Sequence, residues 1–336
     1  MKRAFLVIIV LLSATAVFAD ANFTVFQSGF NEFAQDLANG APMNTSNGLQ
    51  WSQAYIGQFP HFGIGLTVGA TTLSAGAMTT MADALGVTLP SSFSYVSKYG
   101  LPLPTYTIDA RLGGFILPFD IGFKLGYIPP GTLQKMGLQV DLNYILVGID
   151  ARYGLLKDEG WTPALSVGLG YSHMKASVGV PGILPGPIDI LSVAGGHTLG
   201  FTSPTLQLDW STNVLDLKAE ISKKFLFITP YFGVAASLSF GSSASGSVNS
   251  AVTFDGGALT QANINTINAY YNGLGQTPPD LSALGISTSA SKGAGLAFRA
   301  FGGVSFNLFI LWLDLGAGYD FSTGALGGSL NARIAF

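Results

Sequence analysis

The C-terminal stretch 289–336 alternates apolar and polar residues with the two-residue period of a β-strand. Its clearest segment, 311–321, has Leu311, Leu313, Leu315, Ala317, Tyr319 and Phe321 on one face, with Trp312, Asp314, Gly316, Gly318 and Asp320 on the other. Segments 295–306 and 325–336 repeat this pattern, and the printed sequence ends on Phe336. We therefore expect three neighbouring strands, each with one apolar and one polar face.

The same period predicts seven further strands upstream, over 61–73, 105–115, 120–128, 137–155, 161–179, 205–225 and 228–241. The alternation changes phase in two of them. In the fourth strand this predicts a bulge near Tyr144, and in the sixth it predicts either a bulge or a turn at 211–213. Ten strands is the predicted count. A turn at 211–213, together with an extra strand at 51–57, would make twelve, and this alternative stays open.

The predicted connections fall into two groups by length. Three long connections, 75–104, 180–204 and 242–289, come at one end of the strands, and two of them contain helical patterns, at 78–85 and 260–272. Short turns near Leu117, Lys157, Leu226 and Leu308 come at the other end. Long outer loops with short periplasmic turns are typical of transmembrane β-barrels.

Composition favours a barrel in lipid over a soluble β-sandwich, which would bury the same apolar faces. Only 10% of the residues are charged and 48% are hydrophobic, whereas soluble domains carry about 25% charged residues. A sheet face in contact with lipid explains this deficit, because a Lys or Arg near the bilayer centre costs roughly 2–4 kcal/mol. The predicted fold is an all-β, antiparallel transmembrane barrel whose apolar face points outward.

The N-terminal sequence predicts export. Lys2 and Arg3 precede a short apolar run and a small-residue site at 17–19, which is the pattern of a secretory signal peptide over 1–19. Residues 20–50 then form a separate segment with a short amphipathic helix at about 26–38, because Gly40 and Pro42 signal its end. This helix would plug the barrel or latch its rim, and residues 51–336 would form the barrel. Its apolar stripe consists of Phe23, Phe26, Phe30, Phe33 and Leu37.

Charged residues concentrate on the predicted lumen faces, and their signs nearly balance. They either line a polar conduit or pair across strands and fill a narrow barrel. The lumen-lining candidates are Asp109, Arg111, Asp120, Lys124, Asp150, Arg152, Asp216, Lys218, Glu220, Lys224, Arg299, Asp314, Asp320 and Arg333.

The sequence offers little for catalysis. It contains no Cys and three His, with no metal-ligand spacing and no nucleophile elbow. We therefore expect no enzyme activity, no cofactor and no bound metal. Without a basic patch, we also expect no nucleic-acid partner.

Five motifs carry a resemblance to known barrel proteins: FNEFAQDLANG, WSQAYIGQFPHFGIGLTVG, ALSVGLGYSH, SKKFLFITPYFGVAAS and RIAF. The chain resembles a family of uncharacterised outer-membrane barrels of spirochaetes and Bacteroidetes, and is more loosely similar to the long-chain fatty-acid channel family. The latter implies uptake of hydrophobic molecules, although it has more strands and transfers no binding residue. The expected function is a narrow or gated channel for small molecules, hydrophobic ones included. The alternative is a surface-exposed structural or adhesive protein that acts through its long loops.

Location and partners follow from the same reading. We expect the protein in the outer membrane, in contact with its lipid. We also expect its terminal strand to engage the barrel assembly machinery, because a final Phe after alternating apolar residues resembles the assembly signal of such barrels.

Overall fold

The computed structural model describes residues 20–84, 93–115, 117–135, 141–180, 188–193, 196–276, 278, 286–292 and 294–336. The predicted signal peptide, 1–19, lies outside the described residues. Within these ranges, no helix is long and apolar enough to cross a bilayer.

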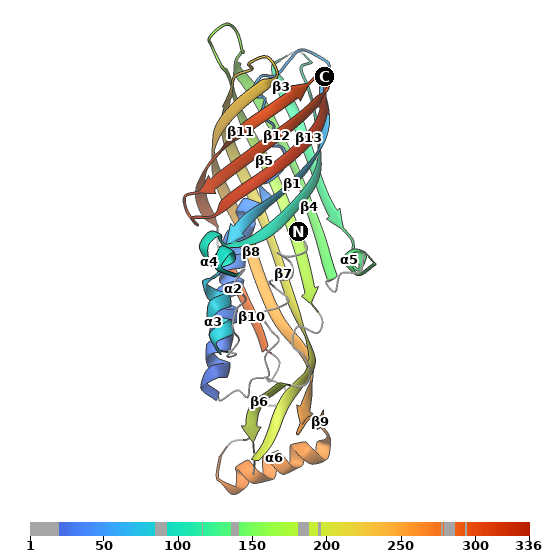
Figure 1. Cartoon of the computed structure of the whole chain (residues 1–336), viewed down its shortest axis with the longest axis vertical. Coiled ribbons are helices and arrows are strands. Elements are labelled where there is room, and N and C mark those ends of the chain that lie inside the picture. The colour runs from blue at the N-terminus through green and yellow to red at the C-terminus, as the bar shows by residue number, and fades with distance from the viewer. Residues whose placement is uncertain are drawn as a thin grey trace.

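Ten long strands close into an antiparallel barrel (Figure 1). In spatial order they are β1 (His61–Leu73), β2 (Leu101–Gly113), β3 (Phe119–Ile128), β4 (Asp141–Leu156), β5 (Ala164–Val180), β7 (His197–Ser222), β8 (Ile228–Phe254), β11 (Gly295–Leu308), β12 (Leu311–Asp320) and β13 (Leu326–Ala335). Pairing of β7 with β8 and of β13 with β1 completes the ring. The predicted count of ten is confirmed, rather than the alternative of twelve.

The outer face of this barrel is apolar and the inner face is polar. On β1, the outward residues Phe62, Ile64, Leu66 and Val68 are exposed, while the residues between them are buried. Charged residues of several strands, including Asp109, Arg111 and Asp120, are buried inside. A barrel with this distribution is built for lipid, since its apolar wall has no protein partner. The predicted all-β transmembrane fold is thus confirmed.

One end of the barrel, here called the long-loop end, carries a tall extension. β7 and β8 continue far beyond the other strands, and β10 (Ile286–Lys292), β6 (Ile188–Val193) and β9 (Gly257–Ala258) pair with them. Helix α6 (Gln261–Gly273) lies at the tip (Figure 1). Shorter helices α3 (Gly76–Ala84), α4 (Phe93–Tyr99) and α5 (Thr132–Lys135) belong to the same end.

The opposite end, here called the short-turn end, holds the connections 113–119, 156–164, 222–228 and 308–311. β1 starts here and β13 ends here, where the Phe336 amide donates to the Phe62 carbonyl at 2.8 Å. The two groups of connections therefore lie at opposite ends, as the sequence predicts.

The N-terminal helix is longer than predicted. α2 (Asp20–Thr45) runs through Gly40 and contains Pro42, so the stop expected there is wrong. Side chains and the barrel satisfy the end of this helix: Thr45 Oγ1 donates back to the Ala41 carbonyl at 2.8 Å, and Lys124 Nζ donates to the Thr45 carbonyl at 2.8 Å. A helix can continue past Gly and Pro where other groups bind its free carbonyls in this way.

The bulge expected near Tyr144 is also wrong. β4 keeps one register with β3 and β5 through Tyr144, and its irregularity lies between Gly154 and Leu156. The phase changes because Tyr144 and Leu146 point inward and are buried in an apolar part of the lumen. In contrast, β7 is irregular against β8 between Ser211 and Asn213, so the bulge expected there is confirmed and the turn is not.

Candidate functional site: a chain segment inside the barrel

Helix α2 packs its apolar side chains against α3 and the β7–β8–β10 extension, and its C-terminal part enters the long-loop mouth of the barrel (Figure 1). Phe30, Phe33 and Leu37 are buried in one cluster with residues of the barrel wall. The wall residues of this cluster include Leu73, Leu101, Leu103, Tyr144, Leu146, Met174, Leu199, Trp210 and Ala244. A Cβ at Gly246, in the extension of β8, would collide with the Phe30 ring, so the extension fits this helix closely. The side chains of Phe23 and Phe26 lie outside the description.

Asp36 of α2 lies beside Ser74, which directly follows β1 at the rim of the barrel. Burial raises the pKa of the Asp36 carboxyl above its ordinary value, and a hydrogen bond from Ser74 opposes this rise. Ionisation of Asp36 therefore destabilises the docking of α2 at the barrel mouth, and protonation of Asp36 stabilises this docking.

Residues 44–56, here called the plug segment, continue from α2 into the lumen. Of these residues, 44–49 are buried, and so are Trp51, Ser52, Ala54 and Ile56. The sequence analysis places the plug or latch at 20–50 and starts the barrel at residue 51. In the structure, the interior contacts instead run without a break from α2 to Ile56.

Three cations of the barrel wall bind the backbone of the plug segment. Lys124 Nζ on β3 donates to the carbonyls of Thr45, at 2.8 Å, and Asn47, at 2.6 Å. Arg111 Nη2 on β2 donates to the Leu49 carbonyl at 2.8 Å. Arg152 Nη1 on β4 donates to the Gln53 carbonyl at 2.9 Å. Three neighbouring strands thus hold successive carbonyls along the segment.

Polar side chains of the plug segment are bound as well. Trp51 Nε1 donates to Asp109 Oδ2 at 2.7 Å, and Ser52 Oγ donates to Asp314 Oδ1 at 3.1 Å. The Trp51 ring lies between two guanidinium groups, with its centroid 5.5 Å from Arg111 Cζ and 4.8 Å from Arg333 Cζ. Charge-assisted bonds and cation–π contacts of this kind are strong in a site with little water.

Glycines on the lumen face make room for the plug segment. A Cβ at Gly63 would lie 2.6 Å from Trp51 Cη2, and one at Gly122 would lie 2.8 Å from Leu49 Cδ2. The position of these glycines opposite bulky side chains of the plug segment shows that the wall and the segment fit each other.

The charges around the plug segment form ion pairs. Arg111 contacts Asp120 at 2.7 Å and Asp150 at 2.8 Å, while Arg152 contacts Asp120 at 2.6 Å. Further lumen pairs are Lys218 with Asp150, Arg299 with Asp216, and Arg333 with Asp314, and His61 Nε2 lies 3.4 Å from Asp120 Oδ2. The interior is therefore paired and filled, which is the packed alternative of the sequence analysis.

Three lumen-lining candidates have other surroundings. Lys224 lies beyond the end of β7 and is exposed, and its Nζ comes within 6.0 Å of the ring centroid of the inward-facing Trp312. Asp320 Oδ1 accepts the Ser322 amide at 2.8 Å and caps the β12–β13 turn. Glu220 is buried beside a small cavity that Leu49 also lines.

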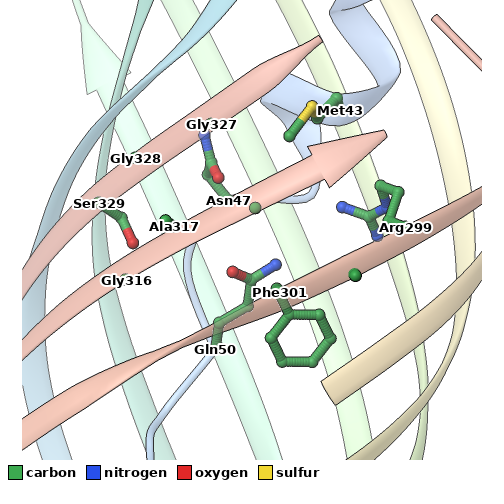
Figure 2. Close-up of a pocket in the computed structure, with 12 residues that line it drawn as sticks. Met43, Asn47, Gln50, Arg299, Phe301, Gly316, Ala317, Gly327, Gly328 and Ser329 are labelled. Carbon is green, nitrogen blue, oxygen red and sulfur yellow. The ribbon is translucent and has the colours of Figure 1, made fainter. Parts of the chain in front are cut away.

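A small cavity lies beside the plug segment. Figure 2 shows a cavity between the plug segment and the wall formed by β11, β12 and β13, with Asn47 and Gln50 on one side and Arg299 on another. Its volume is about 20 Å³, which is enough for about one water molecule. Most of the other lining residues are small, among them Ala317, Gly327, Gly328 and Ser329, while Met43 and Phe301 are the large ones. This cavity therefore admits no solute larger than a water molecule.

Comparison with known proteins gives fold-level likeness. No protein-family model matches the chain, and no curated protein sequence matches it. Similar solved structures include the outer-membrane protease OmpT from Escherichia coli, with 9% identity, 82% of this chain and 97% of that chain covered, and a TM-score of 0.35. The translocator domain of the autotransporter NalP from Neisseria meningitidis has 11% identity, 96% and 99% coverage, and a TM-score of 0.29.

A third match is the monoaromatic hydrocarbon channel CymD, with 10% identity, 93% and 96% coverage, and a TM-score of 0.26. Similarity of this degree says nothing about activity. All three are outer-membrane proteins, whereas the narrower resemblance to an uncharacterised family stays a prediction. The expectation that the chain is not an enzyme is wrong as stated, because a protease is among the matches and such a barrel does not exclude catalysis. In the described ranges, no group of three His, Cys, Asp or Glu is placed to hold a metal.

Proposed function

We propose that the protein is an outer-membrane channel that its own N-terminal segment closes at rest. Displacement of the plug segment would open a polar lumen to small molecules. The observation that carries this proposal is the set of hydrogen bonds that Lys124, Arg111 and Arg152 donate to backbone carbonyls of the plug segment. These contacts are non-covalent, and water can replace each of them once the segment leaves.

The two halves of the lumen suggest which solutes would enter. In the proposed orientation, the long-loop end faces outside and the short-turn end faces the periplasm. A solute arriving from outside would first meet the apolar cluster around α2 and then the charged layer. Small molecules with hydrophobic character fit the first half, and the displaced segment would leave a hydrated path through the second.

Conductance in planar lipid bilayers tests this proposal. The full mature chain is compared with a variant that lacks residues 20–56, in which the signal peptide directly precedes Gly57. We expect rare, brief openings for the full chain and steady conductance for the variant. A variant that folds, as shown by its heat-dependent mobility in gel electrophoresis, but carries no current would refute the channel.

The extension at the long-loop end favours a second candidate, surface display. α6 starts at a capping box formed by Thr260 and Asn263, and most of its residues are exposed. A capped, exposed helix at the tip of a long β-extension is suited to contact a partner outside the cell. Replacing residues 256–276 by a short Gly/Ser linker should abolish binding of cells to a host or matrix surface while leaving conductance unchanged.

Export and assembly complete the proposal. The predicted signal peptide would direct the chain out of the cytoplasm, and the β13 edge ending at Phe336 would be recognised by the assembly machinery before it pairs with β1. Phe336→Ser should lower the amount of folded barrel in the outer membrane, measured by membrane fractionation.

A further inference from the structure

The short turns of the barrel carry large apolar side chains at their tips. Trp161 is 96% exposed, Leu226 is 89% exposed and Phe309 is fully exposed, at 102%. Further apolar residues of the same end are at least half exposed: Phe59, Phe115, Leu117, Phe225, Phe227, Leu308, Ile310 and Phe336. We call this set the apolar rim. Turns in contact with water usually consist of Gly, Asn, Asp and Ser, so the rim departs from what an aqueous environment favours.

Backbone geometry gives independent evidence that these side chains are needed. Leu226 and Phe309 have positive φ angles, of 50° and 57°. Gly and Asn adopt this left-handed conformation readily, whereas a bulky side chain there is unfavourable. These two turns thus hold a large apolar residue where a small or polar one would fit better, which is expected when the side chain itself contacts something.

The rim is continuous with the lipid-facing wall. On β4, outward apolar residues run from Ile145 to Leu155, and the turn follows at once. A transmembrane strand needs about 9–11 residues to cross the hydrocarbon core, and this run of eleven residues uses that length up to the turn. On β11, the same face reaches from Phe298 to Leu308, directly before Phe309. On these two strands, the lipid-facing apolar face therefore reaches the start of the turn without a break.

We propose that the apolar rim is a membrane-binding surface whose turn tips insert at the headgroup–acyl boundary of the leaflet on the short-turn side. The barrel end would then rest in the lipid and not project into the periplasm. Lys157 and Glu159, which are exposed beside Trp161, are at the level where such a turn meets lipid headgroups. A second copy of the chain or a periplasmic protein would be the alternative cover for the rim.

Trp161 provides a probe already present in the protein. The other three tryptophans, Trp51, Trp210 and Trp312, are buried at 3%, 7% and 8% exposure. The full chain is reconstituted in phosphatidylcholine vesicles with unmodified or brominated acyl chains, and its emission is compared with that of Trp161→Phe. The difference in emission between the two proteins is the fluorescence of Trp161. We expect brominated lipid to quench most of this difference. Aqueous acrylamide should leave that emission largely unchanged.

Two further variants report on other positions. In the Trp161→Phe background, Phe309→Trp should be quenched by brominated lipid in the same way, because it occupies a second turn of the rim. Tyr95→Trp in that background is the matched control, since Tyr95 lies in α4 at the long-loop end and is 71% exposed. It should be quenched by acrylamide and not by brominated lipid.

Each other outcome would overturn the inference. Quenching of Trp161 and of the Phe309→Trp probe by acrylamide alone would place the tips in water. Protection from both quenchers would mean that protein covers the rim, and crosslinking would then identify a second copy or another partner. Heat-dependent gel mobility verifies that every variant is folded, and none of these readouts depends on channel activity.

Discussion

Lys124→Met is the sharpest test of how the barrel is closed. Lys124 is 5% exposed, and its Nζ donates to two carbonyls of the plug segment, at 2.8 Å and 2.6 Å. Among the ion pairs of the described residues, none includes Lys124. Methionine keeps the length and apolar character of the side chain, so the change removes both bonds without opening a large cavity.

The expected effect follows from the energy of such bonds. A hydrogen bond to a charged group contributes about 1.5–3 kcal/mol net. Both bonds hold the same short stretch of chain, so their contributions are not independent, and we take about 3 kcal/mol for the pair. Because 1.4 kcal/mol is a tenfold change, the released state should become more populated by a factor on the order of 100.

Single-channel recording measures this population as the open probability. Lys98→Met is the matched control, because Lys98 is an exposed residue of α4, far along the chain from the plug contacts. We expect its open probability to equal that of the parent. If the open probability of Lys124→Met equalled that of the parent while removal of residues 20–56 opened the barrel, the hydrogen bonds of Lys124 would not be what holds the channel closed.

Three further predictions concern the same closed state. Gly63→Ala should raise the open probability, because its Cβ would lie 2.6 Å from the Trp51 ring, whereas Gly76→Ala, with 3.6 Å to its nearest neighbour, should have no effect. Asp120→Asn leaves two buried arginines short of a carboxylate and should lower the free energy of unfolding in urea by about 3–5 kcal/mol. Burial raises the pKa of Asp36, so docking of α2 is favoured below the ordinary pKa of 3.8 and weakens as the pH rises through the shifted value. Asp36→Asn should therefore lower the open probability at neutral pH and flatten its pH dependence.

Much of the barrel is predictable from the sequence because the residues of each strand alternate between those that suit lipid and those that suit the lumen. A strand between lipid and lumen shows the two-residue alternation locally, without reference to its neighbours. The prediction for 61–73 agrees with β1, His61–Leu73, at both ends. The helices predicted at 78–85 and 260–272 are present as α3 and α6, within a few residues. The structure of the long connections was harder to predict, because β7 and β8 continue into them as paired strands where the Ser and Gly content suggests loops.

The contacts of the plug segment could not be predicted in the same way. Trp51 meets Asp109 across 58 positions of the chain, and Ser52 meets Asp314 across 262. Alternation indicates which wall residues face the lumen, but not which segment occupies it or at what height. The one local signal was the row of inward glycines, among them Gly63, and its meaning depends on knowing that Trp51 lies opposite.

The phase change of β4 and the end of α2 have a common cause. Along β4, the inward residues are apolar at Tyr144 and Leu146 and become charged at Asp150. The segment inside changes in the same sense, from apolar Leu37 on the helix to polar Asn47 in the plug segment. An apolar layer of wall stabilises an apolar helix, while a charged layer needs a chain whose carbonyls and side chains can bind ions. The lumen therefore has two chemically distinct layers, and a solute that crosses it must displace a different part of the N-terminal segment in each.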